Sequence, residues 1–243
     1  AKRCENTIMA ALVPNARGAT NAAEARVDEM VVFLSASESH NQKNVNRTIS
    51  ESLAGFREVA RIAGEAGIPI HGAVATALGC PFEGEVPAER LVDIAKHYRE
   101  MGFLGIGLGD TTGMATPSVE RAVTAIREAV PELPISLHFH NTRGIGLVNV
   151  IKGLELGVTR FESSFAGLGG CPFAPGATGN ICTEDLVYLL HEVGYKTGID
   201  LEAICGLARE IESHMKRDLP GQVMKAGPRL QARGTDEVPT AMG

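Results

Sequence analysis

The segment PISLHFHNTRG, from Pro134 to Gly144, decides the fold and locates a site. Its first half is a short apolar run with Pro134 at its edge, which predicts a buried strand of a parallel sheet over Ile135–His140. Residues i and i+2 of a strand point to the same face, about 6 to 7 Å apart, so His138 and His140 can reach one metal ion. Alternatively, the two histidines are a surface pair or satisfied core residues.

Apolar runs alternate with amphipathic segments along nearly the whole chain, a pattern that is typical of parallel sheets with right-handed crossovers. The predicted strands are Ile8–Val13, Met30–Ser35, Ile68–Ala75, Phe103–Gly109, Ile135–His140 and Arg160–Phe165. An open doubly wound sheet can use six such units, whereas a closed barrel needs eight. Polar residues follow successive predicted strands, as the mouth of a barrel requires. We therefore predict an α/β fold, a TIM (β/α)8-type barrel with only about six β/α units in this chain.

Signals for helix starts stand between these strands and after the last one. The clearest is a capping box, formed by Thr48 with Glu51. The other predicted starts are Pro87, the pair Thr116 and Pro117, Thr183 and Asp200. From Lys216 onward polar residues, glycine and proline dominate, so we predict a partial barrel domain over residues 1–215 and a loosely ordered tail over residues 216–243.

Composition narrows the class of protein. The chain has 243 residues and a net charge of −6 without a basic stripe, so one large domain is expected and nucleic acid is not an expected partner. Apolar runs are too short for a membrane span, so no membrane partner is expected either. The five cysteines contain no CxxC pair, and the first residues lack a signal-peptide layout. We expect a reducing, cytoplasmic compartment.

Two further residues carry candidate chemistry. Asp110 ends a predicted strand in GLGDTTG, where a carboxylate can accept a proton or orient a histidine, although Asp before Thr is also ordinary turn chemistry. Cys171 lies in the glycine-rich stretch GLGGCPFAPGATGN, which predicts a mobile lid whose thiol transfers a proton. The alternative for Cys171 is a buried, inert thiol. Cys80 repeats the GCPF tetrapeptide without the flanking glycines and is predicted to be structural.

Asn180 follows the glycine-rich loop and precedes the predicted helix start at Thr183. Its amide oxygen is a hard ligand that suits Mg²⁺ or Mn²⁺. An isolated asparagine at a helix entrance is more often a cap. The nearby histidines nevertheless make Asn180 a candidate ligand.

Several motifs between about Leu12 and Leu201 match one known family together. They are HFHNTRG, GLGDTTG, ALVPN, SASESHNQKNVNRTISES, ALGCPFEG and AGLGGCPFAPGATGNICTEDLVYLLHEVG. The chain thereby closely resembles the 3-hydroxy-3-methylglutaryl-CoA (HMG-CoA) lyases. The broader superfamily, which includes isopropylmalate and homocitrate synthases, shares the histidine strand and the barrel, whereas the cysteine loop is specific to the lyase branch.

The resemblance implies a TIM-like barrel that cleaves an acyl-CoA thioester, HMG-CoA, into acetyl-CoA and acetoacetate with a divalent cation, Mg²⁺ or Mn²⁺. It implies that His138, His140 and Asn180 are metal ligands and that His138 is also placed for proton transfer. It further implies that Asp110 assists at the substrate hydroxyl and that Cys171 acts near the acetyl-CoA carbon. A homodimer is one assembly that the chain could form.

The sequence also departs from the family pattern. Asn141 stands where the family usually has aspartate, and Arg143 stands where it has tyrosine, so hydrogen bonding around the ligands and acyl specificity could differ. The family's first two strands supply an arginine, a metal-binding aspartate and a glutamate, and no such segment precedes Ala1. We therefore expect these two strands to be absent here, through truncation or because the sequence is incomplete. The alternatives in function are a lyase for a longer 3-hydroxy-3-alkylglutaryl-CoA, a condensing synthase, or an inactive truncated fragment that acts only as a binding or oligomerisation module.

Overall fold

The computed structural model of the chain describes residues 7–169 and 179–229. Two compact units make up the chain. The first consists of Ala1–Glu162 and Gly169–Asn180, and the second of Ser163–Leu168 and Ile181–Gly243.

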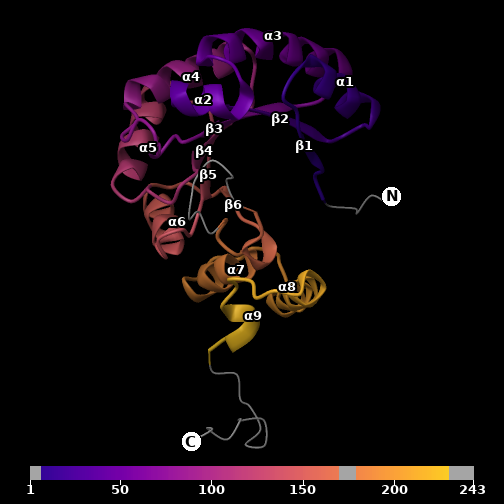
Figure 1. Ribbon diagram of the computed structural model, residues 1–243, viewed down its shortest axis with the longest axis vertical. Helices are drawn as coiled ribbons and strands as arrows, with labels where there is room; N and C mark the ends of the chain where they lie inside the picture. The colour runs from indigo at the N-terminus through magenta and orange to yellow at the C-terminus, as the bar shows by residue number, and fades with distance from the viewer. Residues whose placement is uncertain (1–6, 170–178, 230–243) are drawn as a thin grey trace, which may run out of the picture. The chain divides into compact units, whose positions relative to one another are not determined.

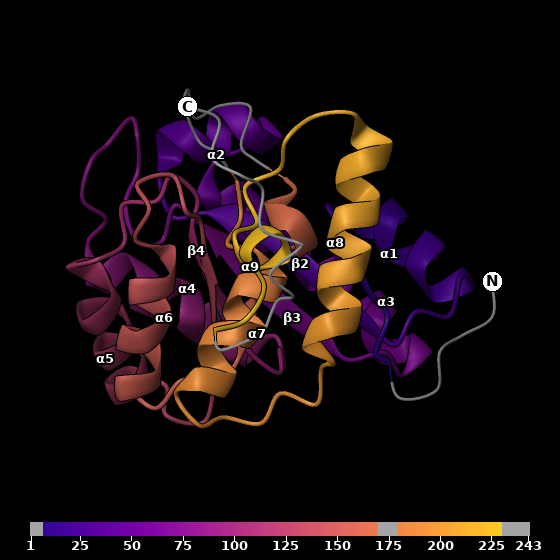
Figure 2. The same ribbon diagram turned by 90° about the horizontal axis from the view of Figure 1, so that it is seen from below.

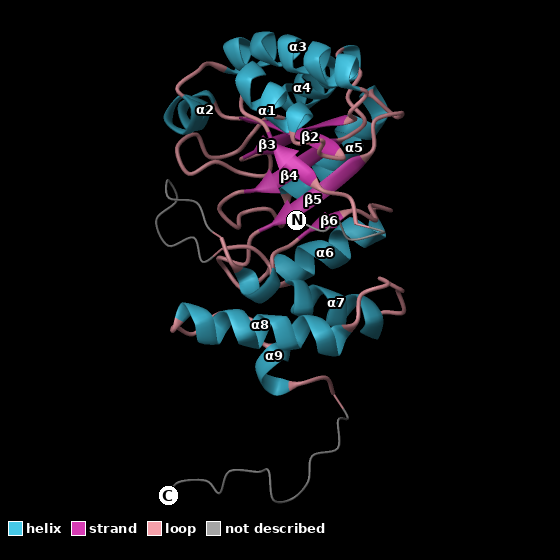
Figure 3. Ribbon diagram, turned by 90° about the vertical axis from the view of Figure 1, so that its right-hand side faces the viewer, coloured by secondary structure: helices cyan, strands magenta, loops and turns pink. Residues whose placement is uncertain are grey.

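The first unit is built on a six-stranded sheet whose strands lie in sequence order. The strands are β1 (Ala10–Leu12), β2 (Glu29–Ser35), β3 (Ile70–Ala75), β4 (Ile106–Asp110), β5 (Ile135–Phe139) and β6 (Phe161–Glu162). Each strand pairs in parallel with the next, and Figure 3 shows the order from β2, near α3, to β6, near α6. A doubly wound sheet would reverse its strand order at a switch point, and this sheet does not. The α/β fold of TIM-barrel type with six strands is therefore confirmed.

Helices cover the outer side of this curled sheet (Figure 1). They are α1 (Ala16–Glu24), α3 (Ile49–Ala66), α4 (Ala88–Glu100), α5 (Ser118–Ala129) and α6 (Gly146–Glu155), whereas the short α2 (Glu38–Val45) follows directly on β2 at the carboxyl end of the sheet. Figure 2 shows α4, α5 and α6 side by side. Burial alternates along the strands: in β5, Leu137 and Phe139 are fully buried, whereas His138 between them is half-buried. The buried positions face the helices, and the alternate positions are left to line the concave side of the sheet.

The packing of α4 on β3 depends on one glycine. A Cβ atom at Gly72 would lie 2.0 Å from the ring of Tyr98, a fully buried side chain of α4. The Tyr98 hydroxyl donates a hydrogen bond to the carbonyl of Ala73 at 3.3 Å. Gly72 is therefore the residue that lets this helix approach the sheet.

The second unit is helical in its described residues. Its elements are η1 (Phe165–Gly167), α7 (Thr183–Glu192), α8 (Leu201–Met215) and α9 (Val223–Ala226). A small core joins Ala166, Cys205, Leu219 and Met224, and the Asp185 carboxylate accepts the backbone N–H groups at the start of α9. Helix α9 lies within the segment for which the sequence predicts a loosely ordered tail. The domain boundaries stay a prediction.

Most local signals were confirmed, with small corrections. All six predicted strands exist, the capping box of Thr48 and Glu51 is formed, and the Asp200 side chain caps α8. Two helices begin one residue away from the predicted cap: Pro117 rather than Thr116 precedes α5, and Cys182 rather than Thr183 precedes α7. No start signal was predicted for α1, α2 or α6. Of these, α2 is short and polar and carries little apolar periodicity. In the described residues, no helix combines the length and the hydropathy needed to cross a bilayer.

Candidate metal and catalytic site

Strand β5 brings the two predicted histidines together. His138 and His140 lie on the concave side of the sheet, and their Nε2 atoms are 3.2 Å apart. Their rings are tilted, with centroids 5.2 Å apart. The i, i+2 spacing therefore produces a convergent imidazole pair, as the sequence predicted.

A carboxylate on the next strand holds the first histidine. The Oε2 atom of Glu162 in β6 lies 2.9 Å from Nδ1 of His138, and the two residues are partners in the strand register. The hydrogen bond from His138 is the main reason why the pKa of the Glu162 carboxyl lies below its usual value, and Ser136 contributes a further hydrogen bond. When Nδ1 of His138 carries the proton that Glu162 accepts, Nε2 presents a lone pair toward His140.

Glu162 was missed at the level of the sequence. Only the register of β5 with β6 pairs it with His138, and nothing in the spacing along the chain reveals that register.

Asn180 lies beside the second histidine. Residues His140 and Asn180 form an isolated antiparallel bridge, and the N–H of Asn141 donates to the carbonyl of Gly179 at 3.0 Å. Gly169, with φ +104°, leaves room for the amide, because a Cβ atom there would lie 2.7 Å from Asn180 Nδ2. The structure therefore brings together all three predicted metal ligands.

Burial keeps His140 neutral. Only 6% of this residue is exposed, and burial, followed by the neighbouring His138, lowers the pKa of His140 to about 4. A neutral imidazole has a lone pair to offer, whereas an imidazolium does not. His140 is thus in the metal-binding form at neutral pH.

The donor set fits a divalent cation. Two donors in adjacent positions of an octahedron, each about 2.1 Å from the ion, lie about 3.0 Å apart. The 3.2 Å between the imidazole nitrogens is close to this value. The described residues contain no cluster of three or more His, Cys, Asp or Glu side chains suited to a metal. The candidate donors for a cation in this part of the chain are therefore two imidazoles and an amide.

A cavity of about 380 Å³ opens beside the histidine pair. His138, His140 and Glu162 line one side of it. Its floor is made by small residues, among them Ala75, Gly107 and Gly109. Because these residues carry almost no side chain, the space next to the histidines is open to a small acyl group.

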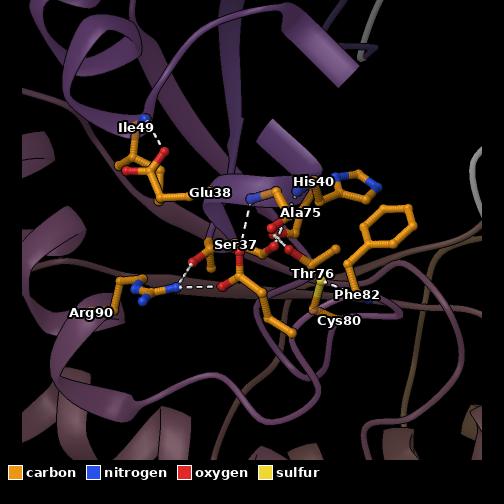
Figure 4. Close-up of polar contacts among 12 residues, drawn as sticks. Ser37, Glu38, His40, Ile49, Ala75, Thr76, Cys80, Phe82 and Arg90 are labelled. Atoms are coloured by element: carbon orange, nitrogen blue, oxygen red, sulfur yellow. Dashed lines mark hydrogen bonds and ion pairs between the residues drawn. The ribbon is translucent and has the colours of Figure 1, made fainter. Parts of the chain in front are cut away.

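The opposite side of the cavity is formed by α2, from which His40 and Asn44 reach the lining. Nδ1 of His40 lies 2.7 Å from Oγ of Ser35 at the end of β2. Figure 4 shows the polar contacts around the start of this helix, where Ser37 caps it and Arg90 donates to the carbonyl of Ala36 at 2.8 Å. These contacts were not predicted, because α2 itself was not.

Asp110 is placed differently from the other predicted residues. Side chains alternate along a strand, and its neighbours Gly109 and Thr111 line the cavity, whereas Asp110 is not among the described residues of the lining. Its Oδ1 accepts the N–H of Met114 at 2.6 Å. Burial raises the pKa of Asp110 to about 6, against the opposing effect of this hydrogen bond and of the Arg143 and His138 charges. The structure does not bring Asp110 into the cavity, and its predicted role stays a prediction.

The cysteines divide into two groups. Cys171 lies outside the described residues, so its predicted role as the lid thiol stays a prediction. Cys80 is buried, and its Sγ accepts the N–H of Phe82 at 3.3 Å in a turn closed by the bridge between Cys80 and Gly84. This geometry agrees with the structural interpretation of Cys80.

Comparison with known proteins assigns the family. The model of the HMGL-like family matches residues 1–211. The hydroxymethylglutaryl-CoA lyase YngG of Bacillus subtilis is 44% identical over 214 residues, which cover 88% of this chain and 72% of that protein. The (R)-citramalyl-CoA lyase of Chloroflexus aurantiacus is 42% identical over 90% of this chain and 69% of its own length.

A solved structure agrees with these sequences. The HMG-CoA lyase of Acinetobacter baumannii, in complex with coenzyme A and 3-methylmalate, superposes with a TM-score of 0.90 at 43% identity, over 96% of this chain and 76% of that one. The parallel sheet in sequence order, the paired histidines and the family match over residues 1–211 lead to one conclusion: the chain belongs to the HMGL-like family.

Proposed function

We propose that this chain carries the cation-binding face of a carbon–carbon lyase that cleaves HMG-CoA into acetyl-CoA and acetoacetate. The observation that carries the proposal is the convergence of His138 and His140, with Asn180 beside them, on a cavity of about 380 Å³. The 44% identity with a hydroxymethylglutaryl-CoA lyase over most of the chain supports the same reaction.

His138, His140 and Asn180 would hold a divalent cation, for which we propose Mg²⁺ or Mn²⁺. A cation bound there supplies Lewis acidity, which makes the tertiary hydroxyl of the substrate easier to deprotonate. The amide oxygen of Asn180 favours a hard cation of this kind over a softer one. The remaining ligands are left to substrate, water or other residues.

Glu162 limits what His138 can do at one time. Because Nδ1 of His138 is engaged by the Glu162 carboxylate, only Nε2 faces His140 and the cavity. One nitrogen cannot both bind a cation and accept a proton. The two roles predicted for His138, ligand and proton carrier, are therefore alternatives within one state of the site, and the 3.2 Å between the imidazoles supports the ligand role.

Cleavage needs two proton transfers. A base removes the proton of the tertiary hydroxyl, the carbon–carbon bond breaks, and the thioester enolate then takes a proton at carbon. We propose the Cys171 thiol as the acid of the second transfer, on the basis of the family motif. For the first transfer the motif offers Asp110, whose Oδ1 is occupied by the N–H of Met114, so any direct role requires its other oxygen.

A second candidate substrate is (R)-citramalyl-CoA. The support for it is the Chloroflexus relative, whose 42% identity is close to the 44% of the Bacillus enzyme. Both thioesters carry a tertiary hydroxyl and a free carboxylate and release acetyl-CoA. Cleavage of (R)-citramalyl-CoA leaves a 2-oxoacid, whereas cleavage of HMG-CoA leaves a 3-oxoacid, so the products distinguish the two. A cytoplasmic location and a homodimer stay predictions.

The test is a product assay on the longest form of the protein that its gene encodes. HMG-CoA and (R)-citramalyl-CoA are supplied separately with Mg²⁺ or Mn²⁺, and acetyl-CoA, acetoacetate and pyruvate are measured. We expect acetoacetate from HMG-CoA, its loss on chelation, and a strong decrease of turnover in Cys171→Ala. Pyruvate from (R)-citramalyl-CoA as the faster product would transfer the proposal to that substrate, and no product from either thioester would end it.

A further inference from the structure

Arg143 joins two loops at the carboxyl end of the sheet. It lies in the turn between β5 and α6, and its Nη1 donates to two successive carbonyl groups of the loop between β4 and α5, Thr112 at 2.7 Å and Gly113 at 3.0 Å. A single guanidinium nitrogen therefore ties the backbone of one loop to the next. Arginine is well suited to this, because its donors stand in a fixed planar fork.

The two loops also touch directly. Gly113 has φ +65°, and a Cβ atom at this position would lie 2.8 Å from Cβ of Thr142. Only glycine fits both the backbone conformation and the space. The Arg143 contact is thus part of a closely packed junction rather than an isolated surface contact.

Asp110 closes the same loop from inside. Its Oδ1 accepts the N–H of Met114 at 2.6 Å, and its carbonyl accepts the N–H of Gly113 at 3.2 Å. The loop from Asp110 to Met114 is therefore held by Asp110 within itself and by Arg143 from outside.

Between these two attachments lies Thr111, which lines the cavity together with His138 and His140. Its Oγ1 accepts the N–H of Thr76 at 2.7 Å. Thr76 has φ +53°, in the left-handed region that a β-branched residue rarely adopts. Such a conformation persists where the surroundings fix it, and it is found mostly near functional sites.

The turn that carries Arg143 is anchored at the cation site on its other side. The N–H of Asn141 donates to the carbonyl of Gly179, next to Asn180, and Oδ1 of Asn141 accepts the N–H of Gly146, both at 3.0 Å. Asn141 has the same side-chain oxygen acceptor as the aspartate that the resembled family usually has at this position, but it carries no charge. The turn thus connects Asn180 on one side with the Thr111 loop on the other.

We propose that Arg143 is a positioning residue for the lyase reaction, which ties the loop Asp110–Met114 to the turn after β5 and so fixes the cavity wall at Thr111 relative to the histidine pair. Asp110 acts in the same way from within the loop. This inference rests on the proposed function for its kinetic consequence, while the junction itself can be tested without turnover.

The first test is amide hydrogen exchange in Arg143→Gln, on the longest form that the gene encodes. We expect faster exchange at the amides of Gly113 and Met114, by about tenfold, because local opening of the loop becomes easier. The matched control is Arg99→Gln, which removes an exposed pair with Glu132 at 3.5 Å and should leave both amides unchanged. Unchanged exchange in Arg143→Gln would overturn the junction, whatever the activity.

The second test is kinetic. Misplacement of a wall of the site should lower kcat by about 10- to 100-fold in Arg143→Gln, with KM and the cation affinity within about twofold. Arg143→Lys, which can reach one carbonyl, should restore part of kcat. In a Thr111→Val background the further loss from Arg143→Gln should be small, because both changes act on the same wall.

The two experiments distinguish the positioning role of Arg143 from the proposed lyase function. The positioning role would be overturned if kcat of the double variant Thr111→Val with Arg143→Gln fell by the product of the two single losses. It would also be overturned if Arg143→Gln increased KM alone. A wild-type protein without turnover would end the proposed function, and the exchange experiment would still decide whether the junction exists.

Discussion

The parts of the fold behind the two sides of the cavity differ in how their buried polar groups are satisfied. On the α2 side, Asn41 accepts the N–H of Ser35 and donates to Arg47 and Ser52, at 2.8 to 3.0 Å. On the side of β4 and β5, the buried atoms Asp110 Oδ2 and Thr112 Oγ1 have no hydrogen-bond partner within the described residues. A satisfied network rigidifies a scaffold, whereas unpaired polar atoms mark a place built for something else. The α2 side therefore has the contacts of a rigid scaffold, and the β5 side is the one on which we propose that the cation binds.

The largest expected effect is on cation binding by the β5 side. His140→Ala removes one of two imidazoles, so we expect the affinity for Mg²⁺ or Mn²⁺ to fall by more than about 100-fold, beyond the 10- to 100-fold typical of a residue that only orients a ligand. Titration calorimetry measures it. Thermal unfolding without the cation measures separately what the variant loses in stability through the cavity that a buried imidazole leaves. Retained affinity would exclude His140 as a ligand.

The next effect concerns the carboxylate behind His138. Glu162→Gln keeps the size of the side chain but removes the charge that orients the ring, so we expect a cation affinity about 10- to 100-fold lower. Glu155→Gln, on the exposed surface of α6, is the matched control. Equal affinities in the two variants would show that Glu162 does not act through His138.

On the α2 side the same kind of change should act on stability instead. Asn41→Ala leaves buried partners unpaired, so we expect the free energy of unfolding to fall by about 1–3 kcal/mol. Urea denaturation measures this change. The cation affinity of the folded protein should stay within about twofold, and a larger loss would mean that the two sides are coupled.

The smallest expected effect is on how the free energy of unfolding depends on pH, because Asp110 and Glu83, one on each side, should change it with opposite sign. In the metal-free protein, burial raises the pKa of Asp110 to about 6 from 3.8, so its contribution to stability is present below about pH 4 and is lost as the pH rises through 6. Asp110→Asn should flatten this part of the stability profile.

Glu83 behaves in the opposite way. Although partial burial opposes it, hydrogen bonds from Ser39, Ser37 and Arg90 lower the pKa of Glu83 to about 2 from 4.5. The contribution of the Glu83 carboxylate to the free energy of unfolding is present above pH 4.5 and is lost as the pH falls toward 2. Solvent exposure keeps this contribution small. Glu83→Gln should flatten only this acidic limb. Thermal unfolding at several pH values measures both variants, and a common slope in the two would contradict the comparison.

The sequence predicted the site where short-range geometry decides it. His138 and His140 were placed by the period of two, the six strands by their apolar runs, and the family by its motifs, which the comparisons confirm. Glu162 could not be predicted, because the register between β5 and β6 is set by the whole sheet.

Asp110 teaches a different lesson. Leu108 and Asp110 lie two residues apart on β4, so alternation alone puts Asp110 on the side of the fully buried Leu108, away from the cavity. Both the place of Asp110 at the end of a predicted strand and the resemblance to a family pointed to direct chemistry, because neither took this alternation into account. Helix α2 was missed for a third reason, because its stability comes from polar contacts that leave no apolar pattern.

The contact between Gly72 and Tyr98 has a consequence for how this family can vary. A ring that would lie 2.0 Å from any Cβ atom at position 72 means that a larger side chain at 72 requires a smaller one at 98. The two positions are 26 residues apart in the chain, yet the side-chain volume that fits at one depends on the side chain at the other. Among homologues they should therefore covary, and a chimera that takes β3 from one relative and α4 from another should fold only when the residues at positions 72 and 98 fit each other in volume.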